Sequence, residues 1–264
     1  MSYQKELDFA KALALEAGKI MRRYFRAEDI GTEWKEDDTP LTVADTAINK
    51  LFIEKAKVTF PEYGILGEEE SYEPDRAIRW IVDPIDGTMP FSLGMPWSTF
   101  SLALSDSKSG ESLLGIVYDP YLDHLFHAIK GGGAFLNGIK LQTSPKTDLT
   151  KSYLSASEGL PNPKGYNPSQ CNEILRNKGA RLFTVYSSAY IATRVATGDL
   201  LGAVSNRALP WDIAAVGLIV REAGGLVIDL DGNPRRLDEE GGYIIAANKS
   251  IEAELLKAVQ AARL

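Results

Sequence analysis

Three short acidic motifs follow one another along this 264-residue chain, and together they carry side chains that can bind a divalent cation. They contain Glu68, then Asp83 and Asp86, then Asp212. Ionised carboxylates gathered in one pocket repel one another and raise one another's pKa unless a cation holds them. Oxygen ligands favour Mg²⁺, Mn²⁺ or Ca²⁺ over zinc, and Mg²⁺ bridges readily to phosphate. The pattern therefore predicts a Mg²⁺ site that acts on a phosphorylated compound.

The middle motif, residues 83–88, has the composition of a turn that gathers ligands at one point. It follows the apolar residues 80–82, which predict the end of a buried strand, so its two aspartates are expected at the strand's carboxyl end. Pro84 fixes φ, and Gly87 allows the backbone to approach a ligand closely. Taken alone, these residues also fit an ordinary turn with helix-capping side chains.

The elements around the motifs follow from the spacing of apolar residues. Helical spacing predicts a long amphipathic helix from about residue 6 to 26, and a second helix after Leu41 with Asp45 near its start, where a carboxylate is a favourable cap. Residues 77–141 show short apolar runs that predict strands, with a hairpin turn at residues 137–138. The glycines at 131–133 match no nucleotide-binding pattern and are interpreted as another turn.

The second part of the chain alternates predicted helices and strands. Helices are expected at residues 188–197 and 213–223, and a strand at 226–228. A connection rich in Pro, Asn and Gly at residues 160–170 is a candidate boundary. We predict an N-terminal α+β half (1–150) that carries the metal-binding motifs and a C-terminal α/β half (151–264) that completes the active site.

Composition excludes several classes of protein. Hydrophobic residues make up 44% and charged residues 25%, as in ordinary globular domains. The net charge of −7 comes without a sustained basic run, so no nucleic-acid partner is expected. The single cysteine, Cys171, excludes an intramolecular disulfide and fits a cytoplasmic protein. No apolar run approaches the roughly 20 residues that span a bilayer, so no membrane partner is expected.

Nucleophilic catalysis finds little support. The two histidines, His124 and His127, lie beside a predicted strand, and no serine stands in a Gly-x-Ser-x-Gly motif. Both are interpreted as exposed or hydrogen-bonded hairpin residues.

The motifs taken together resemble the inositol monophosphatase family, a group of Mg²⁺-dependent, lithium-sensitive phosphomonoesterases. The resemblance covers essentially the whole chain and rests on residues 42–45, 67–69, 83–88 and 211–215. It implies a fold of the α+β or α/β class, a layered α-β-α-β-α sandwich of the sugar-phosphatase type. It also implies a homodimer that acts on a small-molecule phosphate ester.

The resemblance implies two or three Mg²⁺ ions. Glu68, Asp83 and the Ile85 carbonyl would bind one ion, and Asp83, Asp86 and Asp212 would bind a second. A third, weaker ion would use Glu68 and waters. The structural alternatives are a solvated loop position for Glu68 and a helix cap for Asp212.

The resemblance also implies how phosphate and water are held. The N–H groups of Gly87 and Thr88, together with Asp86, would contact the phosphate. Thr88, hydrogen-bonded to Asp45, would orient an attacking water and help to remove its proton. Thr88, Asp45 and Glu68 are therefore the candidate catalytic residues, and helix capping is the alternative role of Asp45.

Substrate identity is less clear from the sequence. Ser205 stands seven residues before Asp212, where inositol phosphatases usually carry a glutamate. Arg207 is a candidate contact to a second anionic group, and its alternative is an ordinary surface arginine. Ser187 and Ala189 match the segment that lines the substrate pocket in relatives.

Three functions are compatible with these motifs. The first is hydrolysis of inositol 1-phosphate or a related sugar or polyol phosphate. The second is hydrolysis of histidinol phosphate or of a 3′(2′),5′-bisphosphate nucleotide. The third is a non-catalytic regulatory or binding role, which the complete set of carboxylates disfavours because uncompensated like charges destabilise a fold.

Overall fold

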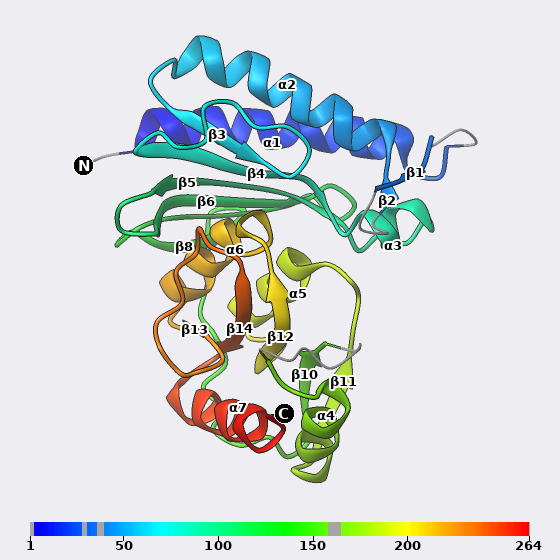
Figure 1. Ribbon diagram of the computed structural model, residues 1–264, viewed down its shortest axis with the longest axis vertical. Helices are drawn as coiled ribbons and strands as arrows, with labels where there is room; N and C mark the ends of the chain where they lie inside the picture. Colours follow the sequence, from blue (N-terminus) through cyan, green and yellow to red (C-terminus); the bar gives the residue numbers. More distant parts are fainter. Residues whose placement is uncertain (1–2, 28–30, 36–39, 158–164, 264) are drawn as a thin grey trace.

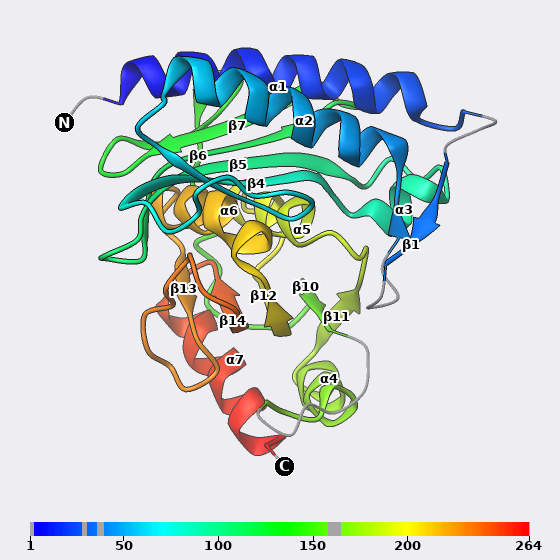
Figure 2. The ribbon, with the colours of Figure 1, turned by 45° about the horizontal axis from the view of Figure 1, so that its top comes forward.

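The computed structural model describes residues 3–27, 31–35, 40–157 and 165–263, which form five layers (Figures 1 and 2). The first layer consists of α1 (Gln4–Tyr24) and α2 (Val43–Thr59), which lie on one face of the larger sheet. The middle layer, α5 (Ser188–Ala196) and α6 (Pro210–Glu222), separates the two sheets. On the far side of the smaller sheet lie α4 (Pro168–Asn177) and α7 (Lys249–Ala261). The predicted α-β-α-β-α sandwich is confirmed.

The larger sheet contains seven strands within the described residues, in sequence order from β3 to β9. β3 and β4 pair in parallel, and the later neighbours pair antiparallel, as successive hairpins do. Beside the sheet, β1 (Glu33–Trp34) pairs with β2 (Pro40–Leu41), and the short helix α3 (Thr88–Ser92) follows β4. The strands are β3 (Gly64–Gly67), β4 (Ile78–Asp86), β5 (Thr99–Asp106), β6 (Glu111–Asp119), β7 (His124–Ile129), β8 (Gly133–Leu136) and β9 (Ile139–Lys140).

The smaller sheet has the order β11-β10-β12-β14-β13. β10 pairs in parallel with β11 and β12, and β14 runs antiparallel to β12 and β13. The predicted division of the chain near residue 150 stays a prediction. Residues 160–164 of the connection at 160–170 lie outside the described residues, and its last residues begin α4. The strands are β10 (Ser152–Ala156), β11 (Ala180–Phe183), β12 (Gly202–Ala208), β13 (Leu226–Ile228) and β14 (Gly241–Ala246).

The predicted turns are present. Asn137 and Gly138 have φ values of 48° and 84° between β8 and β9, as the hairpin prediction requires. The glycine turn between β7 and β8 binds a carboxylate of the protein itself, that of Glu222. The Glu222 carboxylate accepts the N–H groups of Gly131 at 2.7 Å and Gly133 at 2.8 Å, which ties the end of α6 to the larger sheet.

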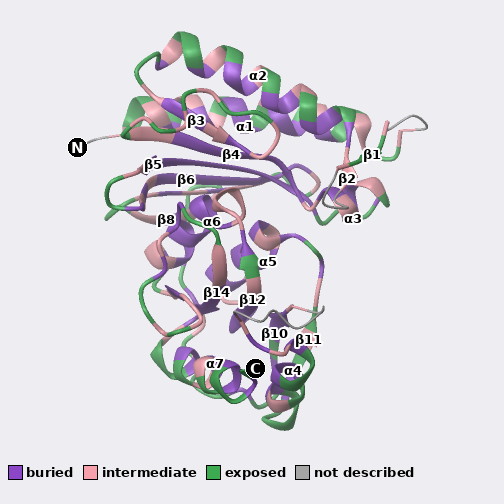
Figure 3. Cartoon of the chain, in the orientation of Figure 1, coloured by how far each residue is buried: buried purple, intermediate pink, exposed green. Residues whose placement is uncertain are grey.

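The central strands of the larger sheet are buried on both faces, and successive side chains face different cores. In β4, Trp80 and Val82 face the core beneath α1 and α2, whereas Ile81 faces the core around α6. The buried residues of both cores are seen along the sheets in Figure 3. Because α6 lies between two sheets, its residues from Ile213 to Val220 are buried on all sides. None of the described helices is both long and apolar enough to cross a membrane.

A glycine allows α6 to lie directly on β6. A Cβ added at Gly115 would stand 2.5 Å from the Ala215 carbonyl oxygen, which belongs to the helix backbone and cannot rotate away. Nearby, the hydroxyl of Ser112 in β6 donates to the Ala214 carbonyl of α6 at 2.7 Å. The position of α6 over the sheet therefore depends on this close approach.

We expect Gly115→Ala to lower the free energy of unfolding by about 1–3 kcal/mol, because the added methyl group pushes α6 away from β6. Urea unfolding followed by circular dichroism measures the change. Gly132→Ala is the control and should lose less, since its added Cβ would stand 3.2 Å from the nearest atom, the Ile129 carbonyl oxygen, and not 2.5 Å as at Gly115. An equal loss in both variants would contradict the packing argument.

Candidate active site

The end of β4 carries both aspartates of the middle motif. β4 continues to Asp86, so the prediction that the strand ends at Val82 was wrong by four residues. Asp83 is paired with Ser101 and Asp86 with Thr99, so three steps along β4 oppose two along β5. This extra residue is a β-bulge. Side chains three positions apart on a regular strand face opposite sides of a sheet, and the bulge brings the two aspartates to the same side.

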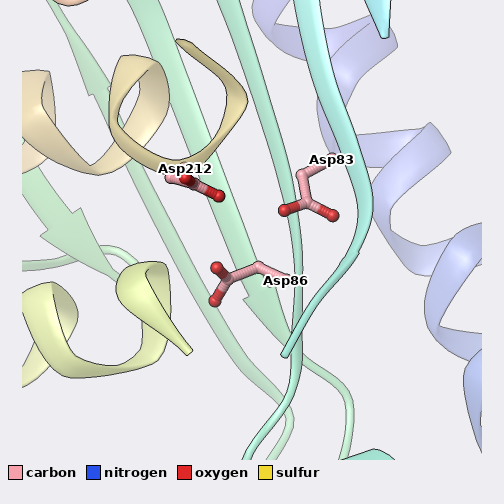
Figure 4. A group of neighbouring side chains, drawn as sticks. All are labelled: Asp83, Asp86 and Asp212. Carbon is pink, nitrogen blue, oxygen red and sulfur yellow. The ribbon is translucent and has the colours of Figure 1, made fainter. Parts of the chain in front are cut away.

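Three carboxylates meet in front of the bulge. One oxygen each of Asp83, Asp86 and Asp212 lies within 4.8 Å of the others. Figure 4 shows Asp83 and Asp86 on β4, with their carboxylates directed toward Asp212 at the start of α6. The structure therefore brings together residues from the second and third acidic motifs, which stand more than a hundred positions apart in the chain.

The electrostatics of this group fit a divalent cation. Asp83 Oδ1 is buried and has no hydrogen-bond partner among the described residues. Burial, followed by the charges of Glu68, Asp86 and Asp212, raises the pKa of Asp83 well above its ordinary value. Burial also raises the pKa of Asp86 to about 6 and that of Asp212 to about 7. A hard cation relieves both the orphaned oxygen and the repulsion, and the all-oxygen donor set suits Mg²⁺.

Asp86 is held by the start of α5. The Ser187 hydroxyl donates to Asp86 Oδ2, the Ala189 N–H donates to the same oxygen at 3.0 Å, and the Ser188 N–H donates to Oδ1 at 3.1 Å. These donors lower the pKa of Asp86 against the larger effect of burial. Ser187 and Ala189 thus position a candidate ligand, and their predicted contact with substrate stays a prediction.

Asp212 is anchored by the helix that carries it. It lies in the first turn of α6, which starts at Pro210, and not before the helix as expected. Its Oδ2 accepts the N–H of Leu209 at 2.7 Å, which satisfies a donor at the helix start. Asp212 therefore does cap the helix, as the structural alternative proposed. It also lies close to the other two aspartates.

Asp45 connects the start of α2 to Thr88. Its Oδ2 accepts the Thr42 N–H at 2.8 Å and the Thr42 hydroxyl at 2.5 Å, so the expected helix cap is present. Its Oδ1 lies 3.3 Å from the Thr88 hydroxyl, which also lies 3.0 Å from the Ile85 carbonyl oxygen. Burial raises the pKa of Asp45 to about 7. The predicted Thr88–Asp45 pair is thus present at the end of the bulge.

Glu68 lies beside the three aspartates and forms an ion pair with Lys35. Its Oε1 lies 2.9 Å from Lys35 Nζ, and Lys35 also contacts Glu69 Oε1 at 2.6 Å. Burial lowers the pKa of Lys35, but the two glutamates outweigh it and raise that pKa. Glu68 is close enough to raise the pKa of Asp83, although the three oxygens within 4.8 Å belong to the aspartates. Its predicted role as a ligand stays a prediction.

Two adjoining cavities open at this site. The first has a volume of about 310 Å³, and its lining includes the three aspartates and Glu68, Ile85, Gly87 and Thr88. The second, of about 190 Å³, is lined by hydroxyl-bearing residues that include Ser187 and Ser205. Tyr186 and Ser188 line both cavities. A ligand bound at the carboxylates therefore has room to extend toward Ser205.

The two candidate specificity residues differ in their surroundings. The Ser205 hydroxyl donates to the Arg207 carbonyl at 2.7 Å and lies 3.2 Å from the Ser157 hydroxyl. Arg207 is 62% exposed and forms an ion pair with Glu240 at 2.8 Å. Arg207 is thus a surface residue paired with Glu240, as the structural alternative proposed. Its contact with a substrate stays a prediction.

Sequence reasoning missed Lys35 and Tyr186. Lys35 stands in a polar connection without a motif or periodic spacing, so no local signal marks it. Tyr186 directly precedes Ser187, and an aromatic residue beside a segment assigned to the pocket was a signal that was available.

Known proteins resemble this chain along its length. The model of the inositol monophosphatase family matches residues 2–264. A histidinol-phosphatase of Chlorobaculum parvum is 35% identical over 96% of both chains, and an inositol-1-monophosphatase of Mesorhizobium japonicum is 34% identical over 94% of this chain and 93% of its own. A solved IMPase/NADP phosphatase in complex with Mg²⁺ and phosphate is 27% identical, with a TM-score of 0.85 over 99% of this chain and 97% of its own.

The match of the family model over nearly the whole chain and two relatives above 30% identity agree with the resemblance that the acidic motifs indicated. The chain belongs to the inositol monophosphatase family.

Proposed function

We propose that this phosphatase hydrolyses the monophosphate ester of a small, neutral polyol or sugar, with inositol 1-phosphate as the leading candidate. The observation that carries the proposal is the group of three buried aspartates beside a cavity with hydroxyl-bearing walls. The carboxylates suit a cation that meets the phosphate, and the hydroxyl groups suit the alcohol part of the ester.

The three aspartates would hold Mg²⁺, assisted by Glu68 and the Ile85 carbonyl. When bound, Mg²⁺ neutralises the carboxylates and phosphate, activates water and stabilises the leaving alkoxide. The complex of a related structure with Mg²⁺ and phosphate supports this choice of ion. Two or three ions per site and inhibition by lithium are part of the proposal.

Thr88 and Asp45 would handle the proton of the attacking water. A water that donates to Thr88 Oγ1 can lose its proton through that hydroxyl to Asp45 Oδ1, 3.3 Å away. A pKa of about 7 suits Asp45 to accept a proton near neutral pH. The N–H groups of Gly87 and Thr88, at the start of α3, would contact the phosphate oxygens.

The same features weigh on the alternatives. A relative named histidinol-phosphatase supports histidinol phosphate as a second candidate. Its alcohol carries an ammonium group, whereas the described side chains of the second cavity are neutral. A bisphosphate would use Arg207, which forms an ion pair with Glu240. A non-catalytic role leaves the converging aspartates without a purpose.

We also propose that the protein is a cytoplasmic homodimer. The partly exposed side chains of Trp97 and Phe183 border one cavity of about 490 Å³, which supports a contact between subunits. The free thiol of Cys171 is buried and fits a reducing compartment.

Phosphate release from inositol, sugar, histidinol and adenosine phosphates tests the reaction. We expect Mg²⁺-dependent, lithium-inhibited release, fastest with a neutral polyol ester. Asp83→Asn and Asp212→Asn are expected to lose nearly all turnover because each removes a charge that holds the cation.

Thermal unfolding without Mg²⁺ provides the control for these variants. Each Asn removes part of the carboxylate repulsion, so both variants should unfold at or above the temperature of the parent protein. Near-parental turnover of both variants at saturating Mg²⁺ would contradict the site.

For Thr88→Ala we expect kcat to fall on the order of 10²-fold, because the route from water to Asp45 is broken. Thr88→Ser keeps the hydroxyl and should retain most of kcat. Steady-state kinetics at saturating Mg²⁺ compares them, and an equal loss in both variants would mean that the hydroxyl is not the active group.

Ser205→Glu restores the acceptor that inositol phosphatases usually carry. We expect it to raise kcat/KM for inositol 1-phosphate relative to glycerol 2-phosphate, because a carboxylate accepts strong hydrogen bonds from ring hydroxyls. An unchanged ratio would place Ser205 away from the substrate.

A further inference from the structure

Tyr186 adopts a backbone conformation that aromatic residues rarely occupy. Its φ is 47°, in the left-handed region, and its side chain is 59% exposed. Such a conformation in a bulky residue is unfavourable and persists only where the neighbouring structure imposes it. Strained residues of this kind concentrate at ligand sites, which makes Tyr186 a candidate for contact with a ligand.

The neighbours of Tyr186 explain how the strain is maintained. The next three residues, 187–189, bind the Asp86 carboxylate through one hydroxyl and two N–H groups. The Ser187 hydroxyl also accepts the Tyr190 N–H at 3.3 Å, which caps α5. The chain must therefore turn sharply immediately before Ser187, and the turn places the Tyr186 side chain at the border between the two cavities.

The second cavity offers neutral acceptors. The Thr184 hydroxyl donates to the Ala156 carbonyl at 2.9 Å, and the Ser205 hydroxyl donates to the Arg207 carbonyl at 2.7 Å. The Ser205 oxygen also accepts from the Ser157 hydroxyl at 3.2 Å and from the Arg207 N–H at 3.4 Å, whereas the Thr184 oxygen retains lone pairs that accept hydrogen bonds. A ligand in this cavity is therefore expected to donate a hydroxyl group to Thr184 and to present a neutral surface to the other side chains.

We propose that Tyr186 is a specificity-determining residue whose ring packs against the carbon–hydrogen face of a neutral, hydroxylated ring, the alcohol part of the substrate. The proposal rests on the function proposed above. A cyclic polyol has hydroxyl edges for the acceptors of the second cavity and an apolar face for an aromatic ring. An acyclic alcohol such as glycerol has no such face, so Tyr186 distinguishes the two.

The test compares Tyr186→Gly and Tyr186→Phe on inositol 1-phosphate and glycerol 2-phosphate. We expect Tyr186→Gly to lower the ratio of kcat/KM for the cyclic ester to that for the acyclic ester about fivefold, the scale of one aromatic contact, mainly through KM. Tyr186→Phe keeps the ring and should keep the ratio. Glycine accepts a φ of 47° without steric cost, so the glycine variant should fold.

Saturation-transfer NMR provides a readout without turnover. With Mg²⁺ and inorganic phosphate present, irradiation of the aromatic protons should saturate the ring C–H protons of myo-inositol in the parent protein and in Tyr186→Phe, and much less in Tyr186→Gly. Equal transfer in all three proteins, or an unchanged kinetic ratio, would overturn the role of Tyr186.

The two proposals fail differently. A parent protein that cleaves both esters while Tyr186→Gly shows the parental ratio refutes the role of Tyr186 and leaves the phosphatase proposal standing. A parent protein that releases no phosphate from either ester, yet transfers saturation to myo-inositol only when the ring is present, refutes the proposed reaction and retains the contact.

Discussion

The site depends on one extra residue in β4. Without the bulge between Asp83 and Asp86, the two carboxylates would face opposite sides of the sheet, one toward α1 and α2 and the other toward α6. Pro84 lies in this interval, where a residue without an N–H costs no ladder hydrogen bond. Gly87, with φ at 88°, then turns the chain into α3. The bulge, Pro84 and Gly87 therefore place the carboxylates of Asp83 and Asp86 on the same side of the sheet.

Helix starts keep that charge in place. Asp45 caps α2, Asp86 binds the first amides of α5, and Asp212 caps α6. Backbone N–H groups and the positive end of the helix dipole stabilise a carboxylate in each case. α2 lies in the first layer, and α5 and α6 lie in the middle layer, so the carboxylates also link these two layers around the end of β4. Capping and catalysis, which are competing explanations in the sequence, are compatible because a carboxylate has two oxygens.

The elements and the grouping of Asp83, Asp86 and Asp212 could be predicted from the residues, whereas the layered arrangement was implied by the family resemblance. The apolar run at residues 80–82 in β4 and the helical spacing in α1 are local patterns, and the acidic motifs have residue types that few other uses require. The end of β4 was placed too early because a bulge depends on pairing with β5, which the sequence of one strand does not contain. The ion pair of Lys35 with Glu68 and the strained turn at Tyr186 also depend on segments far apart in the chain.

The anchoring of the aspartates has a consequence for how the site meets its cation. Protein donors fix Asp86 and Asp212 before any ion arrives, so much of the conformational entropy of gathering these two ligands is lost during folding and not during binding. Ion entry then requires little motion of the backbone. The selectivity of such a preorganised site is governed by how readily an ion of a given radius sheds water to fit a fixed set of oxygens.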